Sequence, residues 1–185
     1  MGFIDVDVSG LTSLDHVNSI LFNFPGGAQR ATWNAAKRAG IAGRKEGAKY
    51  VARVYNISRS SVRKNSTVKV KQTGSGAGTT SVKIIYGGQL VDLLEFKPTV
   101  SSDGVRYEAK RGELHHLPHA FEVQRFGKRI FKRVKRSRLP IRKIKGPSVP
   151  HMMRDPEVGD PMSERIAQIF RERLEREIDY ILKNG

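Results

Sequence analysis

The sequence predicts an α+β fold: a mainly antiparallel sheet with long hairpins, packed by one long Ala-rich helix. Several short stretches alternate apolar and polar residues between Gly and Pro turns, which is typical of antiparallel strands. Residues 28–55 instead carry alanines at helical spacing. We expect a core domain over residues 1–150 and, over residues 151–185, a linker followed by an amphipathic helix.

The N-terminal part begins with residues 3–8, where Ile and Val alternate with Asp and predict a half-buried strand. A short helix over residues 13–24 ends at a Pro-Gly-Gly break. The alanines of the long helix, 28–55, let another backbone approach closely, either from a sheet or from a neighbouring subunit. Each glycine in it disfavours a helix by about 1 kcal/mol relative to Ala, so we expect a kink or fraying. These glycines are Gly40, Gly43 and Gly47.

Downstream, Ser58 is the expected N-cap of a short turn at residues 59–64, and alternation predicts the other strands. The strands are residues 66–72, 80–86, 104–110, 119–125 and 129–134. The first two form a hairpin whose Gly/Ser tip, 73–78, lacks the following helix that a phosphate loop needs. Residues 90–96 fit either a strand or a helical turn.

The chain is organised around residues 118–153, and the part of this stretch at residues 125–145 is what we call the basic ribbon. It holds eleven Lys/Arg and no acid. A turn at 126–128 leads into the returning strand, 129–134, with Ile130 and Val134 expected on one face. So much like charge suggests an anionic partner or acidic neighbouring surfaces; the alternative is a solvated ribbon that keeps the protein soluble. The residues expected to face DNA or a partner are Arg125, Lys128, Arg129, Lys132, Arg133, Arg136 and Arg138.

The C-terminal segment predicts a clear helix. After a loop at 152–159, Asp160 is the expected N-cap and Pro161 the first helical residue. The apolar residues of this helix fall on one stripe, which fits either the chain's own sheet or a neighbouring subunit. The residues assigned to this interface are Phe170, Leu174 and Ile178.

The composition favours some classes of protein and excludes others. The formal net charge is +16 and the isoelectric point about 10.4, values typical of nucleic-acid binders and of proteins assembled against acidic surfaces. The absence of cysteine excludes disulfides and thiolate sites. No apolar run approaches the ~20 residues that span a bilayer, and the acidic start lacks the basic end of a signal peptide. We expect a soluble protein of a reducing cytoplasm, without a membrane partner.

No group of residues predicts catalysis, a metal site or a cofactor site. The histidines at 115, 116 and 119 lack the carboxylate spacing of a zinc site, and no Ser/His/acid set or nucleophile elbow is present. We therefore expect no enzyme, no catalytic residue, no metal and no cofactor. A nuclease is a third hypothesis, which depends on scattered carboxylates. These are Asp92, Glu95, Asp103 and Glu113.

Two stretches carry a resemblance to a known family. The first is Asn34-Ala35-Ala36-Lys37-Arg38-Ala39, followed by Tyr55-Asn56-Ile57-Ser58 and Val62-Arg63. The second runs from Ile130-Phe131-x-Arg133 through Leu139-Pro140-Ile141 to Ile144-x-Gly146-Pro147-Ser148-Val149-Pro150-x-Met152, and its unusual spacing makes it the more specific. Over about half of the chain, the sequence thus resembles the prophage minor tail protein Z family, whose members are tail-completion proteins of long-tailed phages.

The resemblance implies a structural, non-enzymatic virion protein at the head-proximal end of the tail, which assembles in a ring and helps to join head and tail. The implied partners are other copies of the chain, the tail tube, tail terminator or connector proteins, and DNA in the lumen, contacted without sequence preference. The implied location is the virion tail, and the host cytoplasm during assembly.

The alternative is a free-standing, sequence-independent nucleic-acid-binding protein. Such a protein binds nucleic acid as a monomer, with an affinity that falls steeply with salt. An assembly protein binds nucleic acid weakly on its own and associates with itself or with tail tubes.

Overall fold

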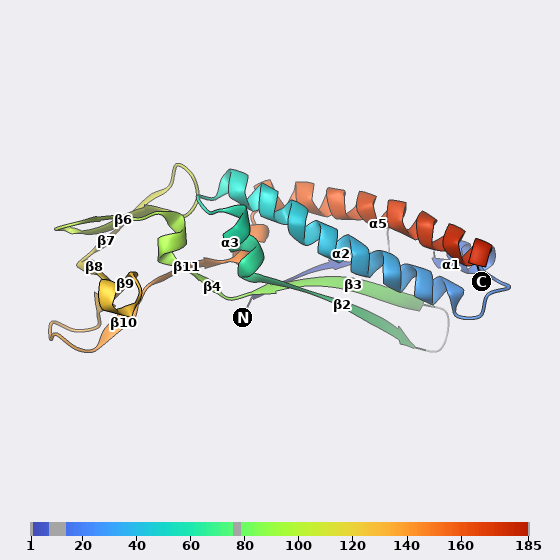
Figure 1. Cartoon of the computed structure of the whole chain (residues 1–185), viewed down its shortest axis with the longest axis horizontal. Coiled ribbons are helices and arrows are strands. Elements are labelled where there is room, and N and C mark those ends of the chain that lie inside the picture. The colour runs from blue at the N-terminus through green and yellow to red at the C-terminus, as the bar shows by residue number, and fades with distance from the viewer. Residues whose placement is uncertain (1, 8–13, 76–78, 185) are drawn as a thin grey trace.

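The computed structural model describes residues 2–7, 14–75 and 79–184, which form an elongated molecule (Figure 1). The helices are α1 (Leu14–Ile20), α2 (Gly27–Val54), α3 (Arg59–Lys64), α4 (Val149–Met153) and α5 (Pro156–Asn184). The strands are β1 (Gly2–Asp7), β2 (Ser66–Ser75), β3 (Thr79–Gly88), β4 (Leu90–Asp92), β5 (Thr99–Ser101), β6 (Gly104–Glu108), β7 (Leu114–Pro118), β8 (Ala120–Val123), β9 (Arg129–Arg133), β10 (Ile141–Lys143) and β11 (Lys145–Ser148). Parts of the predicted first strand, first helix and hairpin tip (residues 8, 13 and 76–78) lie outside the described residues.

Every pairing between the described strands is antiparallel, which confirms the predicted α+β class. The expectation of one continuous sheet is wrong, because the strands form four small sheets: β1–β3–β2, β11–β4, β5–β6–β7 and β10–β9–β8. His119 shows one cause of the division. Its φ of 61° is left-handed, which ends β7 and sends the chain into β8 of a different sheet.

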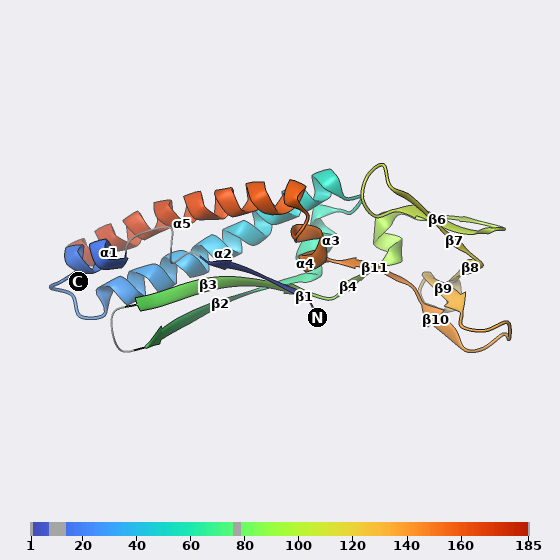
Figure 2. The same ribbon diagram turned by 180° about the vertical axis from the view of Figure 1, so that it is seen from behind.

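The helices cover one face of the sheet β1–β3–β2, and the other small sheets lie beyond one end of the helices (Figures 1 and 2). Ser58 is the N-cap of α3, since its Oγ accepts a hydrogen bond from the Ser61 N–H at 3.1 Å. Residues 90–96 contain both of the expected alternatives: β4, followed by a 3-10 turn at Leu93–Phe96.

Helix α2 lies on the sheet and against α5 through its small residues. Ala31, Ala35 and Ala39 are fully buried. Gly43 faces the Tyr86 hydroxyl of β3, and a Cβ added there would lie 2.7 Å from Ile166 Cγ1 of α5. The helix runs unbroken from Gly27 to Val54, so the predicted fraying at its glycines is wrong. Contacts with β3 and α5 stabilise the backbone at these glycines, which a helix-propensity argument does not include.

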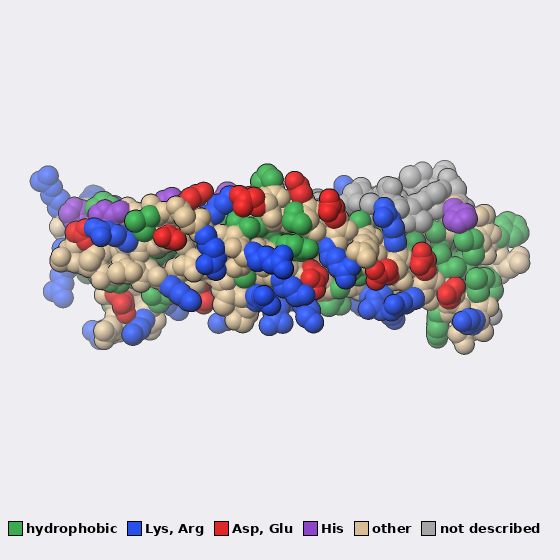
Figure 3. Space-filling model, turned by 90° about the horizontal axis from the view of Figure 1, so that it is seen from above, with side chains coloured by type: hydrophobic (Ala, Val, Ile, Leu, Met, Phe, Trp, Pro, Cys, Tyr) green, Lys and Arg blue, Asp and Glu red, His purple; other side chains and the backbone are tan. Residues whose placement is uncertain are grey.

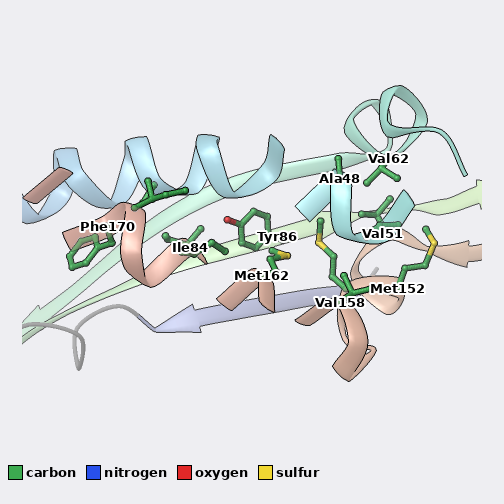
Figure 4. Close-up of a cluster of buried hydrophobic side chains, with 14 of the residues drawn as sticks. Ala48, Val51, Val62, Ile84, Tyr86, Met152, Val158, Met162 and Phe170 are labelled. Atoms are coloured by element: carbon green, nitrogen blue, oxygen red, sulfur yellow. The ribbon is translucent and has the colours of Figure 1, made fainter. Parts of the chain in front are cut away.

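Helix α5 belongs to the same core. Its buried residues Phe170 and Leu174 are 1% and 2% exposed, and Phe170 lies in one cluster with Ile84 and Tyr86 of β3 (Figure 4). The predicted start at Asp160 is wrong, because the helix begins at Pro156. The earlier Asp-Pro pair is the one that begins the helix: Asp155 Oδ1 accepts from the Glu157 N–H at 3.2 Å.

The predicted loop at 152–159 is also wrong except at residues 154–155, because its first two residues belong to α4 and its last four to α5. Residues 149–153 form α4, and Ser148 is its N-cap, with Oγ accepting from the His151 N–H at 3.3 Å. Met152 and Met153 are buried in the core, which favours an ordered turn over a solvated loop. The predicted boundary at residue 150 therefore falls inside a helix whose side chains pack into the common core.

A polar joint connects the helices to the distal strands. Lys110, after β6, pairs with Tyr55 in an isolated β-bridge, and its Nζ lies 2.9 Å from Asp155 Oδ2. The Tyr55 hydroxyl donates to the same carboxylate at 3.0 Å. The hydrogen bond from Lys110 lowers the pKa of Asp155 below its usual value, whereas burial, followed by the hydrogen bond to Asp155, raises the pKa of Tyr55 to about 12.

Candidate functional site

The basic ribbon folds into the sheet β10–β9–β8, at the end of the molecule away from α1 and the C-terminal end of α5 (Figures 1 and 2). The expected hairpin is present: β8 pairs with β9 in the register Phe121↔Phe131 and Val123↔Arg129. The strand β10, at Ile141–Lys143, was not predicted as a strand and adds a third. The β9–β10 connection lies at the outer end of this sheet.

Ile130 fixes the ribbon to the rest of the protein. It is fully buried in the common core, and within the ribbon its carbonyl accepts a hydrogen bond from the Ile144 N–H at 2.9 Å. Because side chains alternate along a strand, Arg129 and Arg133 lie on the opposite face of β9 from Ile130, and both are exposed. Val134, expected on the buried face with Ile130, is 56% exposed because β9 ends at Arg133 and the chain turns away.

The structure places nearly all of the predicted basic residues in solvent. Lys132 is half-buried. The exposed residues are Arg125, Lys128, Arg129, Arg133, Arg136 and Arg138.

An acid from outside the ribbon neutralises part of it. Asp92 of β4 forms a salt bridge with Lys143, and the Arg129 Nε lies 3.8 Å from Asp92 Oδ2. The ribbon therefore has no acidic residue in its own sequence, but Asp92 from another segment lies beside it in the folded protein. No local pattern could have shown this, because the contact depends on how β4 packs beside β9 and β10. Arg129 is consequently less available to a partner than its neighbours.

Three of the predicted residues, Lys132, Arg133 and Arg136, line one open cleft of about 570 Å³ together with Lys135. The Arg133 guanidinium lies 5.8 Å from the centroid of the Phe121 ring, which holds it over an aromatic face. The other predicted residues do not line this cleft.

The opposite wall of the cleft comes from the β5–β6 turn and the end of β7. It carries the hydroxyls of Ser101 and Ser102 and the imidazole of His119, and no local sequence pattern predicts these residues beside the ribbon. Cations and hydroxyl donors are the groups that contact phosphate and sugar without reading bases. The arrangement suits an anionic ligand bound without sequence preference.

In the described part of the chain the scattered carboxylates have separate partners: Asp92 pairs with Lys143, whereas Asp103 accepts from Ser101 Oγ and lies 3.5 Å from His116 Nε2. Asp103 forms a salt bridge with Arg106 at 2.8 Å, and Glu95 accepts from Ser61 Oγ. His115 stacks on Tyr107 with ring centroids 5.2 Å apart. Among the described residues no group of three or more His, Cys, Asp or Glu could hold a metal ion.

The predicted interface residues of the C-terminal helix have a different role. Phe170 and Leu174 are buried within the chain's own core, and Ile178 is half-buried beside them. Of the two alternatives, packing within the chain is the one observed for Phe170 and Leu174. A neighbouring subunit would have to contact other faces of α5.

No helix in the described part of the chain is long and apolar enough to cross a membrane. Comparison with protein-family models, with curated proteins and with solved structures finds no match.

Proposed function

We propose that this protein is a structural, non-enzymatic component of a phage tail that completes the tail at its head-proximal end. In this proposal it assembles in a ring beside tail-tube, terminator or connector proteins and helps to join the head to the tail. It acts in the virion after assembly in the host cytoplasm. The observation that carries the proposal is an exposed cluster of cations at one end of an elongated body, on a stretch that resembles the minor tail protein Z family.

The residues of that resemblance have structural positions in the fold. Leu139-Pro140-Ile141 leads into β10, and Gly146-Pro147-Ser148 forms most of β11. Gly146 packs closely against the Phe96 ring, where an added Cβ would lie 3.0 Å from the ring Cδ2. Ser148 is the N-cap of α4. These residues build the strands β10 and β11 and the start of α4. Such structural roles support an assembly function.

The basic ribbon supplies the contact with DNA in this proposal. A lumen through which DNA passes requires contacts that slide along phosphates and do not grip bases. Exposed Lys and Arg around an open cleft meet this requirement, and Ser102 adds a neutral donor, whereas the Ser101 hydroxyl already donates to Asp103.

The test is complementation of a phage that lacks this gene with the charge-reversal variant Arg133→Glu, Lys135→Glu, Arg136→Glu. These three side chains line the cleft, and all are exposed, so the fold should stay intact. We expect folded protein by circular dichroism and a large loss of infectious particles. Normal titres from the folded variant would refute the role of the ribbon.

The matched control changes charge equally on another surface. Lys69, Lys71 and Lys83 are exposed on β2 and β3, and reversing all three to Glu alters the net charge by the same amount. The proposal expects near-normal titres from this control. An equal loss in both variants would assign the effect to net charge and not to the ribbon.

A second candidate is the free-standing nucleic-acid-binding protein, which the grouping of cations and hydroxyls in the cleft favours. It differs in one measurable respect. Tight binding of an arbitrary DNA duplex by the isolated monomer at physiological salt supports the second candidate, whereas weak binding supports the assembly protein.

A further inference from the structure

A second basic surface lies between α2 and α3, away from the basic ribbon (Figure 1). It is an open groove of about 690 Å³, and none of the described residues that line it is acidic. The proposed contact between the ribbon and DNA uses none of these residues. The cations that line the groove come from α2, α3 and α5 and are Arg38, Arg44, Lys45, Arg63, Lys64 and Arg173.

Part of the positive charge of the groove is unpaired. Lys45, Arg63 and Lys64 are exposed, and they form no salt bridge with any described residue. Like charges that line one groove repel each other, and an anion bound there relieves that repulsion. The unpaired cations are therefore available to an anionic ligand.

The acids close to the groove in sequence or space are already bound to cations. Glu177 of α5 lies 3.2 Å from Arg38, and Glu46 of α2 lies 2.8 Å from Lys49. Helix α5 carries acids and bases side by side, and it contributes only Arg173 to the described lining. The positive surface thus belongs mainly to α2 and α3.

Arg44 is held in one orientation at the junction of α2 and α3. Its Nε donates to Ser66 Oγ at 3.0 Å, and its terminal nitrogen donates to the Arg63 carbonyl. A side chain that is already ordered loses less conformational freedom when a ligand binds beside it. This part of the groove is therefore preorganised.

A row of exposed cations extends the groove along α2. Its members are seven or eight residues apart, so they share one face of the helix. At 1.5 Å per residue, the first and the last lie about 22 Å apart along the helix axis. Figure 3 shows Lys and Arg side chains gathered over the middle of the molecule. We call this set the α2 row; it consists of Arg30, Lys37, Arg38 and Lys45.

The chemistry of this surface favours double-stranded DNA over other anionic macromolecules. Single strands bind through aromatic side chains on which bases stack, and no aromatic residue is among the described lining residues. A helix of an acidic protein needs several apolar anchors, but the lining offers only Ile41 and Ala42. A duplex needs neither, and it carries one negative charge per about 1.7 Å of its length.

We propose that the α2–α3 groove and the α2 row bind the phosphates of a DNA duplex without sequence preference. Lys45, Arg63 and Lys64 supply the central contacts. This site goes beyond the proposed function, because the ribbon contributes no residue to it. It can therefore be tested in a protein whose ribbon is already disabled.

The experiment measures the anisotropy of a short labelled duplex of arbitrary sequence, at salt concentrations from about 50 to 200 mM. The starting protein is the ribbon variant Arg133→Glu, Lys135→Glu, Arg136→Glu, so the binding that remains reports on other surfaces. The groove variant adds Lys45→Gln, Arg63→Gln, Lys64→Gln to it. The matched control instead adds Lys69→Gln, Lys71→Gln, Lys83→Gln, which removes the same charge from β2 and β3.

The expected result is a smaller salt dependence in the groove variant. Each lost phosphate contact lowers the slope of log K against log salt by about 0.9, so three lost contacts lower it by about 2–3. The affinity at the lowest salt should fall at least about tenfold. The control should keep nearly the slope and the affinity of the starting protein. Circular dichroism checks that these exposed substitutions leave the fold intact.

Three results would overturn the proposal. The first is a folded groove variant that keeps the slope and the affinity of the starting protein. The second is an equal loss in groove variant and control, which would assign the effect to net charge. The third is a polyglutamate peptide that binds the groove more tightly than the duplex at the same salt, which would assign the groove to an acidic protein.

The outcome for the groove is independent of the outcome for the ribbon. If the groove variant keeps its slope but the ribbon variant loses infectious titre, the second site is wrong and the proposed function stands. If the ribbon variant has normal titre but the groove variant loses slope, the second site stands and the proposed role of the ribbon is refuted.

Discussion

Replacing Gly43 by Ala should destabilise the protein, although the same change stabilises an ordinary helix. In a helix interior, Ala is favoured over Gly by about 1 kcal/mol. At Gly43 the added Cβ would lie 2.7 Å from Ile166 Cγ1 and would also meet the Tyr86 hydroxyl. Carbon atoms in contact are normally about 3.5–4.0 Å apart, so β3 or α5 must move.

The expected loss of stability in Gly43→Ala follows from these opposing effects. Overpacking a core costs about 1–3 kcal/mol. The Tyr86 hydroxyl also donates to the Gly40 carbonyl at 3.3 Å, and losing a buried hydrogen bond of this kind costs about 1 kcal/mol or more. After the gain in helix propensity, the net loss for Gly43→Ala should be about 1–3 kcal/mol in the free energy of unfolding.

Gly40→Ala is the matched control, one turn earlier in α2. Its Cβ would lie 3.1 Å from Ile84 Cγ2 and from Val68 Cγ1, which is tight but needs only a small shift. The gain in helix propensity should nearly offset this strain, so we expect the free energy of unfolding to change by no more than about 1 kcal/mol. Urea unfolding followed by circular dichroism measures both. If Gly43→Ala is as stable as Gly40→Ala or more stable, the close packing of α2 between β3 and α5 is wrong.

Three further changes test other parts of the fold. Phe170→Ala should lower the free energy of unfolding by about 3–5 kcal/mol and Leu174→Ala by about 2–5 kcal/mol, since both are buried; unchanged urea midpoints would contradict the packing of α5. Ser58→Ala should cost about 0.5–2 kcal/mol through the lost α3 cap, with Ser58→Asp as the control that keeps an acceptor. The lowered pKa of Asp155 means that its ionised form stabilises the fold above the usual aspartate value of 3.8 and that this contribution is lost as the pH falls through and below that value. Asp155→Asn should therefore lower the urea midpoint at pH 7 but flatten its decline in acid, and a parallel decline in both proteins would count against the joint with Lys110.

Elements set by local pattern could be predicted from the sequence. Alternation located β2, β3 and β9, the alanine spacing located α2, and Ser58 marked the start of α3. Each of these signals depends on residues close together in the chain. The C-terminal helix was found for the same reason, but its start was misplaced because Asp155-Pro156 and Asp160-Pro161 carry the same signal. The choice between them depends on tertiary contacts such as the burial of Val158.

Features that depend on distant contacts could not be predicted. The division into separate sheets, the pairing of Asp92 with Lys143, and the two serines beside the ribbon all arise from packing between remote segments.

The position of this protein in an electron-microscopy map of intact phage particles tests the central claim most directly. We expect a ring of copies at the head-proximal end of the tail, with the basic ribbon of each copy towards the lumen. Particles that are complete without this chain, or copies placed elsewhere with the ribbon towards solvent, would contradict it.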